Sequence, residues 1–322
     1  MNKQFGNVLI ISNGRLGDFV SSFVIINPIK SISDRVEVIC KDTYKDIIDN
    51  EQDLFGVTRE EAFGKEYDLL LDLTSTSNTR SISTKIKASK KIGSYRTFAH
   101  KIRSYLLGTY THSFKSIPFN QFTNTRQYYD RFAQAVGVKC QELPVLRKLS
   151  SPTIGSIYAI QNIYPIVGIH ISATDPIRQL PSELIREIIT YIASLGGASI
   201  LIGEKERARE IGLDLPSTYY KEESINELIA ILSQVDYLIG ADSGVLHLAG
   251  AIGTKSLGIY GPNLSKMFGP PGKTVEFLEL DLDCRPCTNS ITCEYNIRCL
   301  NDIEFTDVKA SIDSALNDNN AL

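Results

Sequence analysis

The chain has 322 residues, a length that suits two domains of ordinary size. Hydrophobic residues make up 43% and charged residues 22% of the sequence, as in a soluble globular protein. The formal net charge of −3 indicates no particular class of partner. The longest early apolar run, Val8 to Ile11, is far too short for a secretion signal or a membrane span, so we expect a cytoplasmic protein.

A strand, a turn and a helix are predicted near the N-terminus. The run from Val8 to Ser12 predicts a strand, the glycine-bearing stretch 13–18 a turn, and Phe19 to Lys30 a helix. Asp18 then follows the carboxyl end of a strand, which is the edge that faces the ligand in open α/β sheets. Capping of the helix is the alternative role for this carboxylate. The turn lacks the G-x-G-x-x-G pattern of dinucleotide-binding proteins.

The rest of the first half contains two further strands and a helix. Val36 to Cys40 and Tyr67 to Leu73 are predicted strands, and Gln127 to Val136 is a predicted helix. We interpret Asp72, at the end of its strand, as a loop cap rather than a ligand contact.

The predicted domain boundary follows from proline content. Three prolines within residues 141–165 argue against a continuous helix or a central strand there. We therefore predict residues 1–140 as the first domain, 141–165 as a linker and 166–322 as the second domain.

The stretch from Leu73 to Tyr129 contains no Asp or Glu but ten Lys and Arg residues. It carries +10, and since the net charge is −3, the rest of the chain carries −13. Aromatic residues are interleaved with the cations. This composition predicts attraction to an anionic partner, and a solvated basic face is the alternative interpretation. No recognised nucleic-acid motif is present, so we expect no nucleic-acid partner.

The second half opens with alternating strands and helices. Ile166 to Ile171 is a predicted strand, Ser182 to Leu195 a helix, Ser199 to Gly203 a strand, and a further helix begins at 204–207. Arg178 lies in the loop before the first of these helices. An arginine there can neutralise a diphosphate with two parallel donors, or it is an ordinary surface cation.

The stretch from Tyr237 to Tyr260 predicts one βαβ unit. Strands are expected at 237–241 and 256–260, with a helix at 245–252 between them. The turn Asp242-Ser243-Gly244 comes at the start of that helix, where free backbone N–H groups and the helix dipole favour an anion. His247 is expected one turn into the helix, facing the site. An ordinary N-cap and a packed histidine are the alternatives.

Four of the six cysteines cluster in the tail, at Cys284, Cys287, Cys293 and Cys299. The C-x-x-C spacing suits one metal ion, and four thiolates can complete a tetrahedral zinc or iron site. The alternatives are free thiols, or a disulfide formed after purification. A helix from Thr306 to Leu316 is predicted to end the chain.

Three motifs together resemble those of glycosyltransferase family 9, the heptosyltransferase family of lipopolysaccharide assembly. The string D-S-G-x-x-H-L-A-x-A-x-G-T-x-x-x-x-x-Y-G-P, beginning at Asp242, is similar to the family's donor-site signature. R-L-G-D, ending at Asp18, resembles its amino-terminal motif. Residues 172–181 resemble the second donor motif, small residues followed by Lys-x-Trp-Pro, with Arg178 at the Lys position and Leu180 at the Trp position.

The resemblance implies a GT-B fold, in which two Rossmann-like α/β domains face a central crevice. It implies inverting transfer of a sugar, heptose from ADP-heptose, to a lipopolysaccharide core or related glycan. Asp18 would be the catalytic base and Glu206, with Glu204 in reserve, would bind the ribose. The diphosphate would be held by the set Arg178, Asp242, Ser243, Gly244 and His247. Catalysis would need no metal ion, although some family members bind iron in a similar cysteine-rich tail.

The expected acceptor is an anionic glycolipid at the inner-membrane surface, with which the protein would associate peripherally. The predicted acceptor contacts are four lysines of the basic span, Lys85, Lys87, Lys90 and Lys91. Two other functional classes are open: a GT-B transferase that uses a UDP- or GDP-linked sugar, and a non-catalytic protein that docks through its basic face or its cysteine cluster.

Overall fold

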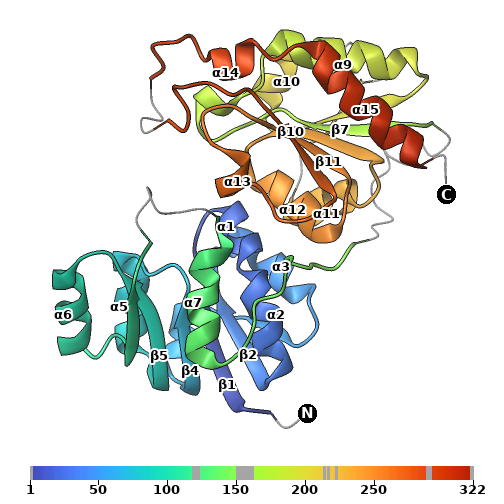
Figure 1. Ribbon diagram of the computed structural model, residues 1–322. Coiled ribbons are helices and arrows are strands. Elements are labelled where there is room, and N and C mark those ends of the chain that lie inside the picture. The colour runs from blue at the N-terminus through green and yellow to red at the C-terminus, as the bar shows by residue number, and fades with distance from the viewer. Residues whose placement is uncertain are drawn as a thin grey trace. The chain divides into compact units, whose positions relative to one another are not determined.

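A computed structural model of the chain describes residues 3–117, 124–149, 163–212, 215, 218–221, 224–287 and 292–319. The chain forms two compact units, Met1–Arg147 and Lys148–Leu322. Each unit contains a six-stranded parallel sheet flanked by helices, as predicted for the α/β class (Figure 1). The boundary between the units falls inside residues 141–165, the predicted linker, of which 150–162 lie outside the described residues.

The sheet of the first unit has the strand order β3-β2-β1-β4-β5-β6. The strands are β1 (Phe5–Ile11), β2 (Ser33–Ile39), β3 (Leu54–Gly56), β4 (Glu66–Asp72), β5 (Lys87–Tyr95) and β6 (His112–Lys115). The order reverses between β1 and β4, whose registered pairs run from Val8 with Leu69 to Ile11 with Asp72. Ligands of open α/β sheets bind beyond the carboxyl ends of the strands at such a switch point.

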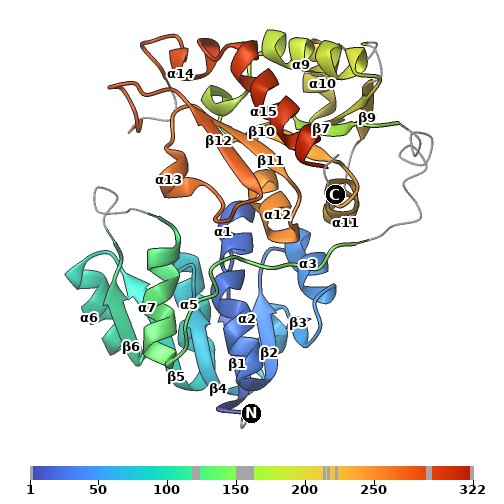
Figure 2. The same ribbon diagram turned by 45° about the vertical axis from the view of Figure 1, so that its right-hand side comes forward.

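The helices of the first unit pack on both faces of this sheet. They are α1 (Leu16–Ser21), α2 (Phe23–Ser31), α3 (Lys45–Asp49), α4 (Arg59–Phe63), α5 (Ser77–Lys85), α6 (Phe98–Leu106) and α7 (Arg126–Val136). α2 and α7 lie side by side over one face (Figures 1 and 2). On the other face Ala62 of α4 and Ile82 of α5 join a core with Leu9 and Leu70.

The predicted helix Phe19–Lys30 is in fact two helices, and the first begins earlier. α1 starts at Leu16, so Asp18 lies in its first turn rather than in the preceding turn. Ser22 separates α1 from α2, and its hydroxyl donates to the Phe19 carbonyl at 2.5 Å. A serine that bonds back to the preceding turn competes with the backbone ladder, which explains the break in an otherwise apolar helical run.

The sheet of the second unit has the order β12-β11-β10-β7-β8-β9. Its strands are β7 (Ile166–His170), β8 (Ala198–Ile202), β9 (Thr218–Lys221), β10 (Tyr237–Ala241), β11 (Ser256–Tyr260) and β12 (Val275–Glu279). Its α-helices are α9 (Ser182–Ser194), α10 (Lys205–Ile211), α11 (Ile225–Leu232), α12 (Gly244–Ile252), α13 (Ser265–Phe268), α14 (Arg298–Asn301) and α15 (Phe305–Asn319). The order reverses between β7 and β10, which defines the second switch point.

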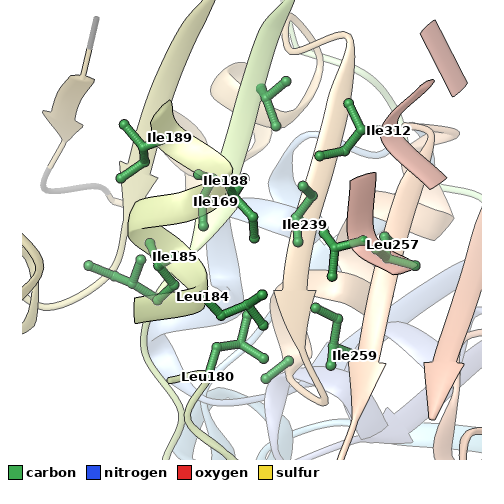
Figure 3. Packing of buried hydrophobic residues seen from close by; sticks show 14 of the residues in the cluster. Ile169, Leu180, Leu184, Ile185, Ile188, Ile189, Ile239, Leu257, Ile259 and Ile312 are labelled. Carbon is green, nitrogen blue, oxygen red and sulfur yellow. The ribbon is translucent and has the colours of Figure 1, made fainter. Parts of the chain in front are cut away.

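A core of branched aliphatic side chains fixes this second sheet. Apolar residues such as Leu184, Ile188 and Ile192 recur along α9 and lie on one side of it. This side packs against the sheet residues Ile169 and Ile239 (Figure 3). Full burial of each such side chain stabilises the fold by about 1.5–3 kcal/mol. The carboxyl ends of β7 and β10 are therefore held in fixed positions. No helix among the described residues is long and apolar enough to cross a membrane.

Candidate functional site

Polar side chains meet at the switch point of the second unit. β7 ends at His170, and the Ser243 hydroxyl, just beyond β10, lies 3.2 Å from Nδ1 of that histidine. Gly240 on β10 makes room, because a Cβ at this position would lie 3.2 Å from the His170 Cβ. His170 is buried, and burial lowers its pKa from 6.5 to about 4, so the imidazole is neutral at physiological pH. Sequence reasoning missed His170 because it ends an otherwise apolar strand.

The first turn of α12 presents backbone N–H groups that the preceding serine does not cap. Ser243 occupies the N-cap position, with φ −154° and ψ 163°, but its hydroxyl accepts no hydrogen bond from the helix. The hydroxyl lies instead near His170. Gly244 begins α12, and His247, one turn in, is buried. The N-terminal N–H groups and the helix dipole favour an anion at this point.

Asp242 holds two neighbouring loops in place. The residue is 7% exposed, and its carboxylate accepts hydrogen bonds from Asn263 Nδ2 at 2.6 Å and Arg178 Nη1 at 3.3 Å. The second terminal nitrogen of Arg178 contacts Asp175. Arg178 is therefore held between two carboxylates and is not an ordinary surface cation. Its guanidinium has five N–H donors, so donors remain for a further anion.

The cysteine-rich tail contacts this site through a buried arginine. The Arg285 side chain, 2% exposed, donates to the carbonyl oxygens of Gly261 at 2.5 Å and Asn263 at 2.6 Å. It also pairs with Glu279 at 2.7 Å. The backbone N–H of Cys287 donates to the Pro262 carbonyl at 2.9 Å. The C-R-P-C turn thus fixes the loop that carries Asn263. Because Asn263 donates to Asp242, the turn also fixes the Asp242 carboxylate indirectly.

The four tail cysteines are free thiols. Cys299 is buried and the other three are partly buried. Burial, and after it the charge of Cys287, raises the pKa of Cys299 to about 11. Within the described part of the chain, which omits 288–291, no three His, Cys, Asp or Glu side chains are close enough to hold a metal ion. The predicted metal site therefore stays a prediction.

The two glutamates considered for the ribose differ in position. Glu206 lies in the first turn of α10, with its side chain 78% exposed and 3.9 Å from Arg209. Glu204 is the N-cap residue, and its backbone N–H donates to the Ser172 hydroxyl, just after β7, at 2.7 Å. Glu204 is thus tied directly to the carboxyl edge of the sheet, whereas Glu206 points into solvent. The ribose contact stays a prediction.

In the first unit the Asp18 carboxylate is exposed at the carboxyl edge of β1. Its Oδ2 lies 3.4 Å from the backbone nitrogen of Arg15, a weak capping contact. Gly14 permits this approach, because a Cβ there would lie 2.8 Å from that of Asp18. Asp72, by contrast, is fully buried and accepts from the Ser75 backbone at 2.7 Å. The interpretation of Asp72 as a loop cap is confirmed.

The four lysines predicted to contact the acceptor lie away from this edge, and their role as acceptor contacts stays a prediction. Lys85 ends α5 and Lys87 begins β5, so both lie at the amino edge of the parallel sheet, opposite Asp18. Lys90 donates to the Ala135 carbonyl at 2.6 Å. Lys91 is buried and donates to the Ser83 carbonyl at 3.0 Å. Two of the four lysines thus donate hydrogen bonds to carbonyl groups of the same unit.

Comparison with known proteins identifies the family. The sequence matches the model of glycosyltransferase family 9 (heptosyltransferase) over residues 59–297. The chain therefore belongs to glycosyltransferase family 9 and is a glycosyltransferase. No curated protein matches this sequence.

Three solved structures share the fold along nearly their whole length. The family 9 glycosyltransferase of Veillonella parvula is 16% identical, with a TM-score of 0.80 and 99% of each chain covered. E. coli ADP-heptose lipopolysaccharide heptosyltransferase II is 15% identical, with a TM-score of 0.76 over 98% of this chain and 99% of that one. E. coli heptosyltransferase WaaC with ADP is 14% identical, with a TM-score of 0.71 over 96% and 99%. The predicted GT-B fold is confirmed.

The buried His170 generates a prediction about acid stability. Because its pKa falls from 6.5 to about 4 on folding, the unfolded chain binds more protons between these pH values. The contribution of the neutral His170 side chain to the free energy of unfolding is therefore fully present above pH 6.5 and is lost as the pH falls. Between about pH 6.5 and about pH 5 the wild type loses free energy of unfolding, and replacing His170 with Gln should reduce this loss by about 2 kcal/mol. Urea unfolding at both pH values measures this, and the exposed His112→Gln is the control. An equal acid loss in His170→Gln and the wild type would contradict the account.

Proposed function

We propose that this glycosyltransferase moves heptose from ADP-heptose onto a lipopolysaccharide core or a related glycan, with inversion at the anomeric carbon. The observation that carries the proposal is the turn after β10. There the Ser243 hydroxyl does not cap α12, and Arg178 is fixed beside Asp242. Backbone N–H groups and a guanidinium that converge on one sheet edge suit a diphosphate. The E. coli proteins of similar fold carry ADP or ADP-heptose in their names, which supports an ADP-linked donor.

The proposed reaction is a single in-line displacement. The Asp18 carboxylate takes the proton of the acceptor hydroxyl, and the hydroxyl oxygen attacks the anomeric carbon as its bond to the nucleotide diphosphate breaks. The leaving diphosphate gains negative charge. The N–H groups at the start of α12, the Ser243 hydroxyl and the Arg178 guanidinium would stabilise that charge. Because Asp175 and Asp242 already fix the guanidinium, little reorganisation is needed as the charge develops.

The proposed acceptor is an anionic glycolipid at the cytoplasmic face of the inner membrane, with which the protein associates peripherally. The basic span without acidic residues supports an anionic acceptor. Because Lys85 and Lys87 lie at the amino edge of the sheet, we add to the proposed acceptor contacts the cations near the carboxyl edge, such as Arg96, which is exposed just after β5.

A metal ion at the cysteine cluster is part of the proposal as a structural element, not as a catalyst. Four thiolates in the tail are a donor set that zinc or iron accepts. Purified, reduced protein should contain about one zinc or iron per chain, and Cys284→Ser with Cys287→Ser should lose the metal and melt at a lower temperature. Elemental analysis and thermal unfolding measure this, with Cys40→Ser as the control for metal content. Metal-free wild-type protein would end the proposal.

The donor class is tested with nucleotides and by turnover. Calorimetric titration should show that ADP binds more tightly than UDP or GDP, and ADP-heptose should add one heptose to a lipopolysaccharide core acceptor. Tighter binding of UDP or GDP would favour a transferase with a different donor. Nucleotide binding without turnover of any donor would favour the non-catalytic alternative.

Asp18→Asn should keep the fold and the affinity for ADP but lower turnover by about 10²–10⁴-fold, because the amide cannot accept the proton. Steady-state transfer kinetics measure the loss. Asp34→Asn, an exposed carboxylate near the amino end of β2, is the control that should transfer at the wild-type rate. Near-normal turnover in Asp18→Asn would remove this residue from the role of base.

A further inference from the structure

Helix α6 exposes its apolar side chains and buries a polar one. Ser104 is its only buried residue. The large apolar side chains of the helix and its C-cap are exposed: Phe98 by 70%, Ile102 by 46%, Tyr105 by 80%, Leu106 by 75% and Leu107 by 53%. In α7 of the same unit the apolar residues Tyr129, Phe132 and Val136 are buried, as expected for a helix that packs on a sheet. The outward apolar face of α6 therefore distinguishes it from α7.

The exposed residues form one amphipathic face. Phe98, Ile102, Tyr105 and Leu106 are spaced i, i+4, i+7 and i+8, which places them along one side of the helix. Contiguous apolar surface of this kind marks an interaction site rather than scattered surface hydrophobics. α6 lies at the β6 end of the sheet, where β6 is the edge strand (Figures 1 and 2).

A groove continues this face toward the edge strand. It has a volume of about 970 Å³ and lies between α6, β6 and α7. Its apolar lining includes Phe98, Ile102 and Phe114, and its polar lining includes Lys101 and Arg131. The guanidinium carbon of Arg131 lies 5.9 Å from the centre of the Phe114 ring. Apolar surface and cations thus share one concave face.

The formal charges on α6 and β6 are of one sign. Arg96, Lys101 and Arg103 are exposed on α6 or just before it, and no Asp or Glu occurs between Leu73 and Tyr129. None of these three cations is in a salt bridge among the described residues. An anionic surface therefore complements the face. A second copy that used the same face symmetrically would bring its cations against these cations, which is unfavourable.

We propose that α6 and this groove form a docking surface for a bilayer of anionic phospholipid. The aromatic and aliphatic side chains lie at the boundary between headgroups and acyl chains, while Arg96, Lys101 and Arg103 contact headgroup phosphates. α6 begins three residues after β5 ends at Tyr95, so its N-terminus lies at the same sheet edge as Asp18. A bilayer bound there would present a lipid-borne acceptor to that edge. This surface deepens the peripheral membrane association proposed above, and its role in presenting the acceptor rests on that proposed function.

The absence of tryptophan from the chain permits a direct test. Tyr105→Trp introduces a single fluorophore on the proposed face, and Leu195→Trp, exposed at the end of α9, is the matched control in the other unit. With vesicles that contain phosphatidylglycerol, the emission of Tyr105→Trp should shift to shorter wavelength, and that of Leu195→Trp should not. Vesicles of phosphatidylcholine alone should give a smaller shift, because they lack the anionic attraction.

A charge variant tests the electrostatic part. Lys101→Gln with Arg103→Gln should weaken co-sedimentation with anionic vesicles by about fivefold per cation, and salt should weaken wild-type binding. Lys85→Gln with Lys87→Gln removes the same charge at the amino edge and should bind as the wild type does. ADP affinity should be unchanged in all variants, so failure of lipid docking is distinguishable from failure of the donor site.

Three results would overturn the docking surface. They are no co-sedimentation of the wild type with anionic vesicles at low salt, sedimentation without an emission shift in Tyr105→Trp, and an equal loss in both charge variants. Self-association that disappears in Phe98→Ser with Tyr105→Ser, without lipid binding by the wild type, would assign the face to a second copy instead and would also overturn the proposal.

Discussion

The proposed donor site depends on one buried carboxylate, that of Asp242. It accepts hydrogen bonds from Asn263 and Arg178, which come from loops on either side of β10. Such a carboxylate is costly to bury unless its charge is paired and hydrogen-bonded, and here Oδ2 accepts from both Arg178 and Asn263. Arg285, itself buried, fixes the backbone of the Asn263 loop from the tail. The geometry at the start of α12 is thus set by contacts that extend into the cysteine-rich segment.

The topology of the sheets explains why these polar groups gather where they do. In the second unit β7 and β10 flank the switch point, so His170 and Ser243 meet there. In the first unit β1 and β4 flank the equivalent point, with Asp18 just beyond one strand and Asp72 at the end of the other. Of these two carboxylates, Asp72 is satisfied internally and Asp18 is exposed. The same architecture therefore places the proposed anion site in one unit and the proposed base in the other.

Sequence reasoning located the elements whose pattern is apolar and missed those whose pattern is not. β1, β7, β10 and β11 are continuous apolar runs in buried parallel strands, and each was predicted within a few residues. β5 was not predicted, because its lysines hide the pattern: Lys91 is buried against carbonyl groups.

The side-chain contacts of the site were also beyond the sequence. Composition shows that the lysines are there but not which edge of the sheet they occupy, since that depends on the order of the strands. Pairings such as that of Arg285 with Glu279 arise only when the chain has folded.

The most direct test of the account is the affinity of ADP for Arg178→Gln, measured by calorimetry beside a control variant, Arg209→Gln, which replaces an exposed arginine on α10. The account predicts that Arg178→Gln binds ADP at least about tenfold more weakly, since a hydrogen bond to a charged group contributes about 1.5–3 kcal/mol, while Arg209→Gln matches the wild type. Unchanged ADP affinity in Arg178→Gln would contradict the assignment of the nucleotide site to this edge of the second unit.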